Sequence, residues 1–340
     1  MHVPISAEQG HDPVITILHS TDRPHGLDGP HVRYVTDETL TAALPGTEVL
    51  LVWDFTSTAV SGAWPAADSL RWVHTASAGV DRLTFPALLE SDVVLTNSRG
   101  VFDAPIAEYV TGLVIAMAKD LPGTLAGQAG REWRHRETER VGGRTAVVVG
   151  SGPIGRATAA MLGAVGMRVE LVGRRAGEGV QAIDALPGLL PRAEWLVLAA
   201  PLTDATHGML NATTLGMLPP GARVINVGRG ALVVQGDLVA ALQEGRLGGA
   251  ALDVFEREPL PVDSPLWELP GVIVSPHMSG DILGWRDALE ALFVDNLARY
   301  RAGESLRNVV DKTLGFVTTS DEVTTSGELA SPPSTTGSAR

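Results

Sequence analysis

The chain has 340 residues, of which 44% are apolar, and it carries a formal net charge of −13. This length allows two domains with separate cores, and the apolar fraction indicates a compact, soluble protein rather than a disordered one. The negative charge argues against nucleic acid or an anionic membrane as the main partner, because either would need a basic face, and the lack of cysteine rules out disulfides, thiolate chemistry and cysteine-based zinc sites.

The amino-terminal part predicts a first domain over residues 1–97. It begins without the basic and apolar regions of a secretory signal. The longest apolar stretch, 109–118, is about half of the ~20 residues that span a bilayer, so we expect a cytoplasmic protein. Apolar segments alternate with helical or loop segments, which favours a parallel sheet. The expected strands are 14–18, 48–53, 71–75 and 93–96.

A long apolar helix is predicted next, over 103–119, with Asp103 as a candidate cap and Pro105 tolerable in its first turn. A charged connector, 131–140, then leads into the six-stranded, doubly wound Rossmann-type sheet of a dinucleotide-binding domain. The six expected strands are 146–149, 168–172, 195–199, 222–227, 249–254 and 272–274.

The dinucleotide-binding domain is expected to span residues 98–282. A helical stretch over 282–302 returns the chain, so that 283–317 completes the first domain. The remaining residues, 318–340, are rich in Ser, Thr, Gly and Pro, a composition typical of a disordered tail.

The motif Gly150-Ser-Gly152-Pro-Ile-Gly155 follows a short β-branched strand and precedes a helical segment. The first glycine permits a tight turn, the second lets the backbone approach a pyrophosphate, and the third allows helix and strand to pack closely. The free N–H groups and partial positive charge of the helix N-terminus attract phosphates. In this context the motif predicts a dinucleotide site.

The residues after the predicted strand 168–172 indicate which dinucleotide binds. An NAD-binding unit normally carries Asp or Glu there, which accepts a hydrogen bond from the ribose 2′-hydroxyl. This chain has Gly173-Arg174-Arg175 instead, and two guanidinium groups can clamp a 2′-phosphate. We therefore expect NADP to be preferred, with NAD as the second option; the alternative is that both arginines are merely solvated.

Arg229, Glu258 and His277 each follow the end of a predicted strand of the second sheet. Because the carboxyl ends of parallel strands line the ligand crevice, these side chains can converge. His277 can exchange a proton near pH 7, Glu258 can orient it and favour its protonated form, and Arg229 can hold a carboxylate and polarise a carbonyl. Together they suit hydride transfer to a 2-keto acid. The nine histidines show no metal-ligand spacing, so no metal site is predicted.

Several segments resemble the D-isomer-specific 2-hydroxyacid dehydrogenase family, over about residues 45–310. They are Gly150–Gly155, Asn226-Val-Gly-Arg-Gly230, Leu252-Asp-Val-Phe-Glu-Arg-Glu-Pro-Leu260, Pro265-Leu-Trp267 and Ser275-Pro-His277. The resemblance implies a Rossmann-type cofactor domain, a flavodoxin-like substrate domain, and catalytic roles for Arg229, Glu258 and His277. It also implies a homodimer packed through the cofactor domain and the helix 103–119. The missing acid at Gly173 is similar to the NADP-preferring glyoxylate/hydroxypyruvate reductase branch.

The resemblance implies further contacts. Backbone N–H groups of Ala78, Gly79 and Val80 are expected to bind the substrate carboxylate. Backbone N–H groups of Pro153 and Ile154 are expected to meet the pyrophosphate. The other implied cofactor contacts are Ala200, Pro201 and Thr206 along the cofactor, Val227, Gly228 and Asp253 on its nicotinamide side, and Gly280 in the loop after the histidine.

These observations predict an NADPH-dependent reductase that converts a small 2-keto acid, such as glyoxylate or hydroxypyruvate, to the D-2-hydroxy acid. One alternative is an NAD-linked dehydrogenase of another D-2-hydroxy acid, such as 3-phosphoglycerate, although only Arg71 and Arg82 lie close in sequence to the Ala78 loop to bind a phosphate. Another is a corepressor-like binding protein that senses the dinucleotide, since such relatives keep the fold and the triad.

Overall fold

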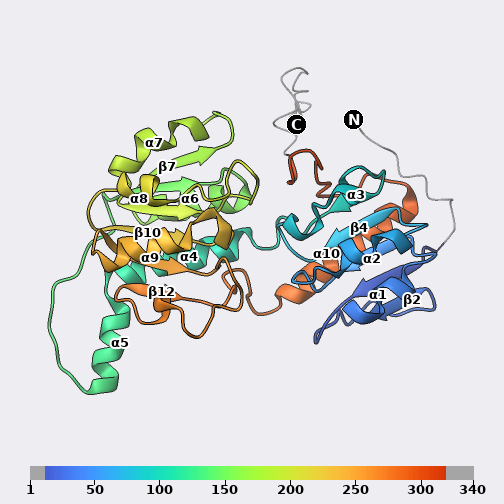
Figure 1. The fold of residues 1–340 in the computed structure, drawn as a ribbon, viewed down its shortest axis with the longest axis horizontal. Coiled ribbons are helices and arrows are strands. Elements are labelled where there is room, and N and C mark those ends of the chain that lie inside the picture. Colours follow the sequence, from blue (N-terminus) through green and yellow to red (C-terminus); the bar gives the residue numbers. More distant parts are fainter. Residues whose placement is uncertain (1–11, 319–340) are drawn as a thin grey trace, which may run out of the picture.

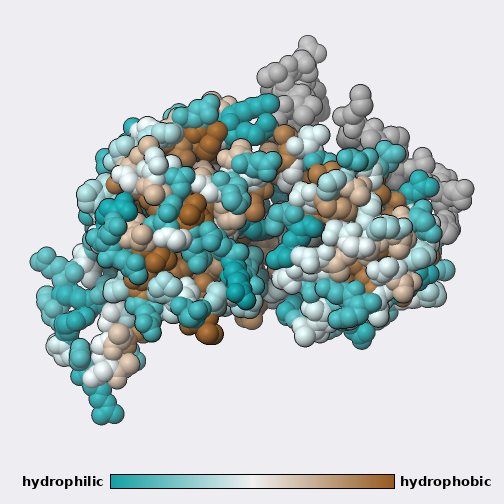
Figure 2. Space-filling model, viewed as in Figure 1, coloured by the Kyte–Doolittle hydropathy of each residue, from teal (hydrophilic) through white to brown (hydrophobic). Residues whose placement is uncertain are grey.

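The computed structural model describes residues 12–318, which form two α/β lobes with a cleft between them (Figures 1 and 2). Residues 1–11, where no secretory signal was predicted, lie outside this range. The predicted tail, 318–340, also lies outside it, apart from Thr318. Within 12–318, no helix has the length and apolar character needed to cross a membrane. The chain passes between the lobes before α4 and again before α10 (Figure 1). The exact domain boundaries remain a prediction. Limited proteolysis, with cleavage expected at these two crossings, tests them.

The first lobe is built on a five-stranded parallel sheet in the order β2-β1-β3-β4-β5. This is the flavodoxin-like order. Four strands were predicted; β2 was missed because it lies at the sheet edge and only one of its four residues is buried. The strands are β1 (Ile15–Leu18), β2 (Val32–Val35), β3 (Val49–Val52), β4 (Trp72–Thr75) and β5 (Val94–Thr96).

Helices cover both faces of this sheet, which is why β1, β3 and β4 are buried along their whole length. Leu50 packs with Leu40 of α1 on one face. On the other face Trp72 stacks on Phe293 and Tyr300 of α10, with ring centroids 5.2 and 5.6 Å apart. The returning helix therefore packs on the first lobe, as predicted. The helices are α1 (Asp37–Ala43), α2 (Ala59–Ala63), α3 (Pro86–Leu89) and α10 (Trp285–Ala302).

The second lobe contains a seven-stranded parallel sheet in the order β12-β11-β10-β9-β6-β7-β8. All six predicted strands are present, but the predicted number is wrong, because β8 adds a short edge strand with a single buried residue. The winding reverses between β6 and β9, which places a ligand crevice outside their carboxyl ends. The strands are β6 (Thr145–Val149), β7 (Arg168–Gly173), β8 (Val180–Ala182), β9 (Trp195–Leu198), β10 (Ala222–Asn226), β11 (Leu247–Leu252) and β12 (Val272–Val274).

Helix α4 confirms the long predicted helix and packs on α6, with Val114 and Leu162 in one apolar core. Its N-cap residue is Phe102, so the predicted cap is wrong; Asp103 is instead the first helical residue, where its charge still suits the helix N-terminus. Helix α5 was not predicted, since its sequence LPGTLAGQAG is rich in glycine, and it projects from the lobe (Figure 1). The helices are α4 (Asp103–Ala118), α5 (Leu121–Gly130), α6 (Pro153–Ala164), α7 (Leu186–Leu189), α8 (Ala212–Gly216) and α9 (Gln235–Gln243).

Short 3₁₀ turns complete the two lobes. They are η1 (Trp64–Ala66), η2 (Asp81–Leu83), η3 (Ile183–Ala185), η4 (Leu190–Arg192), η5 (Gly230–Leu232) and η6 (Pro265–Trp267). Two of them border the cleft, because η2 follows the Ala78 loop and η5 follows Arg229.

Candidate active site

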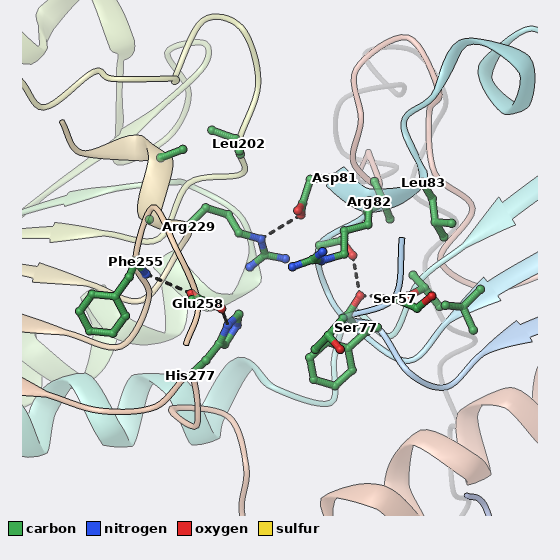
Figure 3. Close-up of a pocket in the computed structure, with 18 of the residues that line it drawn as sticks. Ser57, Ser77, Asp81, Arg82, Leu83, Leu202, Arg229, Phe255, Glu258 and His277 are labelled. Carbon is green, nitrogen blue, oxygen red and sulfur yellow. Dashed lines mark hydrogen bonds and ion pairs between the residues drawn. The ribbon is translucent and has the colours of Figure 1, made fainter. Parts of the chain in front are cut away.

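A cavity of about 380 Å³ lies in the cleft and is lined by residues of both lobes (Figure 3). The first lobe contributes the segments after β3 and β4, and the second contributes those after β10, β11 and β12. The structure thus brings together Arg229, Glu258 and His277, which lie at the ends of three different strands. Sequence reasoning did not propose several other lining residues, namely Phe55, Ser57, Ser77, Asp81 and Arg257.

His277 is paired with a carboxylate. Its Nδ1 lies 2.8 Å from Glu258 Oε2, and the backbone N–H of Phe255 donates to Glu258 Oε1 at 3.0 Å. Burial alone would raise the pKa of Glu258, but the hydrogen bonds from His277 and Phe255, with the charges of His277 and Arg229, bring it below its ordinary value. At neutral pH, Glu258 is therefore a carboxylate facing the imidazole.

The backbone at His277 is strained. Its φ of 53° lies in the left-handed region, which residues other than glycine rarely adopt. The fully buried carboxylate of Asp253 holds the residues on both sides, accepting from the N–H groups of Met278 and Ser279 at 3.0 and 2.9 Å and from the Ser275 hydroxyl at 2.7 Å. The His277 N–H donates to the Asp253 carbonyl oxygen at 2.9 Å. These bonds fix the direction in which the imidazole leaves the loop.

Arg229 reaches across the cleft. Its Nε donates to Asp81 Oδ1 at 2.9 Å, and one terminal nitrogen donates to the Gly228 carbonyl at 2.8 Å. The other terminal nitrogen lies over Gly79, where any side chain would overlap it. In Figure 3, Arg229 extends from the second lobe toward Asp81 and Arg82 of the first. The guanidinium therefore lies directly against the loop predicted to bind the substrate carboxylate.

That loop has its carbonyl groups paired and its N–H groups free. The carbonyl of Ala78 accepts from the Asn97 amide at 2.6 Å, and that of Gly79 accepts from the Ser77 hydroxyl at 2.6 Å. Among residues 12–318, no hydrogen bond engages the backbone N–H groups of Ala78, Gly79 or Val80. A concave run of free N–H groups is suited to an anion such as a carboxylate.

The glycine motif forms the turn between β6 and α6. Gly150 has a φ of 120°, and a side chain there would overlap the backbone of Ala199. A side chain at Gly155 would overlap the Gly150 carbonyl, so the third glycine is what brings helix and strand together. No atom lies within 4 Å of the position that a Gly152 side chain would take, which leaves open space at the N-terminus of α6. These residues fit a dinucleotide.

Comparison with known proteins identifies the family. Residues 111–279 match the family model described as "D-isomer specific 2-hydroxyacid dehydrogenase, NAD binding domain". The chain is 34% identical to glyoxylate/hydroxypyruvate reductase B of Pectobacterium carotovorum, over 72% of this chain and 80% of that protein. The chain belongs to the D-isomer-specific 2-hydroxyacid dehydrogenases. It is therefore an NAD(P)-dependent enzyme that interconverts 2-hydroxy and 2-keto acids.

Further relatives of this chain include a second glyoxylate/hydroxypyruvate reductase and a dehydrogenase of another substrate. An NADPH-dependent glyoxylate/hydroxypyruvate reductase from Sinorhizobium meliloti shares its fold with a TM-score of 0.75 and 28% identity, covering 89% of this chain and 99% of that one. A D-3-phosphoglycerate dehydrogenase of Methanocaldococcus jannaschii is 30% identical over 72% of this chain and only 48% of its own length. The present chain thus spans about half of the length of that relative.

Other predicted cofactor residues follow β9 and β10, and the backbone of Ala200 lies against Gly150. Gly228 follows Val227 at the end of β10 and lies against the carbonyl of Ala200, which leaves no room there for a side chain. The Thr206 hydroxyl donates to the Pro201 carbonyl at 2.7 Å and closes the loop after β9. Their contacts with the cofactor stay a prediction.

The local structure bears on three further predicted contacts. Pro153 has no N–H group, so Ile154 is the first residue of α6 that can donate to a phosphate. A side chain at Gly280 would overlap the Phe102 ring, so packing against the start of α4 already requires glycine there. The carboxylate of Asp253 is directed at the loop that carries His277, and its contact with nicotinamide stays a prediction.

Proposed function

We propose that the enzyme reduces small 2-keto acids of the glyoxylate or hydroxypyruvate type with NADPH and releases the D-2-hydroxy acid. The observation that carries this proposal is the placement of the His277–Glu258 pair in one cavity with Arg229 and the free N–H groups of the Ala78 loop. A proton donor and two carboxylate-binding elements are what reduction of a 2-keto acid requires.

In the proposed mechanism the N–H groups of the Ala78 loop and the guanidinium of Arg229 hold the substrate carboxylate, and Arg229 polarises the adjacent carbonyl. Asp81 keeps Arg229 in this position. His277 donates a proton to the carbonyl oxygen as negative charge develops on it, and Glu258 stabilises the protonated imidazole before that transfer. The nicotinamide, when bound, supplies the hydride.

Initial rates with glyoxylate, hydroxypyruvate, pyruvate, phenylpyruvate and 3-phosphohydroxypyruvate, each with NADPH and NADH, test this proposal. We expect the fastest turnover with NADPH and either glyoxylate or hydroxypyruvate. Absence of turnover with all of them would favour the corepressor-like alternative.

A second candidate function, reduction of a phosphorylated 2-keto acid, gains support from the cavity. Arg82 and Arg257 both line it, so a second anionic group on the substrate would meet basic side chains that the sequence alone did not bring together. Arg71 does not line the cavity. If 3-phosphohydroxypyruvate has the highest kcat/KM of the panel, this second function replaces the first.

The NADPH preference is proposed from Arg174 and Arg175, which are exposed at the end of β7. Gly173 is buried, and a side chain there would overlap Ser151 and Val180. The end of β7 therefore has no room for the acid that binds the ribose 2′-hydroxyl in NAD-binding units. Replacing both arginines with alanine is expected to raise the Kd of NADPH about 10- to 100-fold, since charge-assisted hydrogen bonds to a phosphate are lost, and to leave that of NADH within about twofold. Arg192→Ala, an exposed arginine of the same lobe that pairs with Glu170, is the control. Equal changes for both cofactors would contradict the assignment.

Glu258 is expected to assist the proton transfer from His277. In Glu258→Gln the imidazole loses its carboxylate partner, so kcat for reduction should fall about 10- to 100-fold. Because folding lowers the pKa of Glu258, the wild-type pair also stabilises the fold above the ordinary glutamate pKa and loses that contribution as the pH falls through the lowered value. A Glu258→Gln enzyme with wild-type kcat would show that Glu258 does not assist His277.

We also propose a cytoplasmic homodimer. Leu121 and Leu125 of α5 are 44% and 64% exposed, and Trp133 in the following connector is 100% exposed. Exposed apolar side chains on a projecting arm are typical of a protein–protein contact, and Ile115 of the neighbouring α4 is also exposed. Sedimentation equilibrium should give twice the mass of one chain, and cell fractionation tests the location.

A further inference from the structure

The segment after α10 is anchored in the first lobe. The N–H of Val310 donates to the Leu95 carbonyl at 2.8 Å, and Lys312 Nζ donates to the carbonyls of Leu88 and Ser91 at 2.9 and 2.7 Å. Arg99 donates to the Val317 carbonyl at 2.9 Å. These bonds tie both ends of the segment 310–317 to the edge of the first sheet.

Between these anchors the chain folds into a tight turn over 311–316. The N–H of Asp311 donates to the Phe316 carbonyl at 3.0 Å, and the Gly315 N–H donates to the Asp311 carbonyl at 2.8 Å. Asp311 Oδ1 accepts from the N–H and hydroxyl of Thr313 at 2.9 and 2.6 Å. The turn therefore presents Phe316 and the Asp311 carboxylate from a fixed backbone.

This turn meets the second lobe at Arg174. The Arg174 Cζ lies 5.7 Å from the centroid of the Phe316 ring, within the range of a cation–π contact. The Thr313 hydroxyl bond lowers the pKa of Asp311, and the positive charge of Arg174 adds to that lowering, so the carboxylate also feels the guanidinium. Arg174 is the residue that follows β7, where a dinucleotide fold places the adenosine ribose.

We propose that Phe316 is a positioning residue for the cofactor 2′-phosphate, which it serves by holding Arg174 from the opposite lobe. This inference rests on the NADPH use proposed above. An exposed arginine samples many rotamers, and a ring that restricts it before the cofactor arrives reduces the entropy lost on binding. Asp311 has the opposite effect, because its carboxylate competes with the phosphate for the same guanidinium. Selectivity for the phosphorylated cofactor is thus set partly by the first lobe.

Calorimetric Kd values of NADPH and NADH for the full chain test this inference without relying on turnover. Phe316→Leu keeps an apolar side chain but removes the ring, and it should raise the Kd of NADPH about two- to fivefold while leaving that of NADH unchanged. Phe316→Tyr, which keeps the ring, should restore the wild-type value. Asp311→Asn keeps an oxygen for the Thr313 bonds but removes the charge, so it should lower the Kd of NADPH and leave that of NADH unchanged.

Phe85→Leu is the matched control, because Phe85 lies in the same lobe but contacts Trp64 and not the second lobe. It should change neither Kd. A Phe316→Leu variant that weakens both cofactors equally, or neither, overturns the inference.

Arg174→Ala separates this inference from the proposed function. If that variant leaves the ratio of the two Kd values unchanged, Arg174 does not bind the 2′-phosphate, and the part of the NADPH proposal that rests on Arg174 is wrong. If it lowers the preference for NADPH while Phe316→Leu and Asp311→Asn do not, only the role of Phe316 is refuted.

Discussion

His277→Ala is expected to lower kcat for reduction of the 2-keto acid about 10²- to 10⁴-fold, with little change in KM for either substrate. The imidazole is the proposed proton donor, and the Glu258 bond at 2.8 Å orients it, so its loss removes transition-state stabilisation without removing the carboxylate site on the Ala78 loop. Single-turnover measurements at saturating NADPH separate the chemical step from product release.

His31→Ala is the control for this variant, since His31 is exposed on the first lobe and does not line the cavity. It should keep wild-type kcat. A His277→Ala enzyme that turned over at the wild-type rate would refute the proposed acid–base role, whatever the substrate proves to be.

Arg229→Ala is expected to lower kcat/KM about 10²- to 10³-fold, because the polarising group at the carbonyl is lost. Arg229→Lys should recover little of this loss. The arginine donates to Asp81 and to the Gly228 carbonyl and places its remaining nitrogen over Gly79, whereas a single ammonium group cannot occupy all three positions.

Asp81→Asn refines this prediction. The amide still offers an oxygen to Arg229 Nε but no charge, so we expect a higher KM for the 2-keto acid with a smaller effect on kcat. Arg246→Ala, at an exposed arginine paired with Glu244, is the control. If Arg229→Lys retained wild-type kcat/KM, the fork geometry of the arginine would have no part in catalysis.

The sequence was sufficient for most of the fold because buried parallel strands appear as apolar runs. β2 and β8 were missed for the converse reason, since edge strands with few buried residues carry no such run. Helix α5 was missed because its glycines disfavour a helix, although Asp120 caps its first turn by accepting from the Gly123 N–H at 3.1 Å.

The residue pattern alone predicted the part of the candidate site in the second lobe, and only the family resemblance added the Ala78 loop of the first. Arg229, Glu258 and His277 were found because each follows a strand of the same sheet, and strand ends in one sheet converge. Asp81 contacts Arg229 and Phe316 contacts Arg174 of the other lobe, and nothing in their local sequence indicates these partners. Asp81 directly follows Val80 of the predicted anion-binding loop. Because an acid beside such a loop needs a basic partner, this position could have predicted an arginine or lysine nearby.

The order of the chain through the two lobes has a consequence for synthesis. The second lobe is one continuous stretch, whereas the first needs α10, whose Phe293 and Tyr300 cover Trp72 from more than two hundred residues downstream. As the polypeptide leaves the ribosome, the inserted lobe can finish folding while one apolar face of the first sheet is still bare. Within the described residues 12–318, α10 is the helix that covers this face, so during translation the first lobe depends most on protection from aggregation until α10 has emerged.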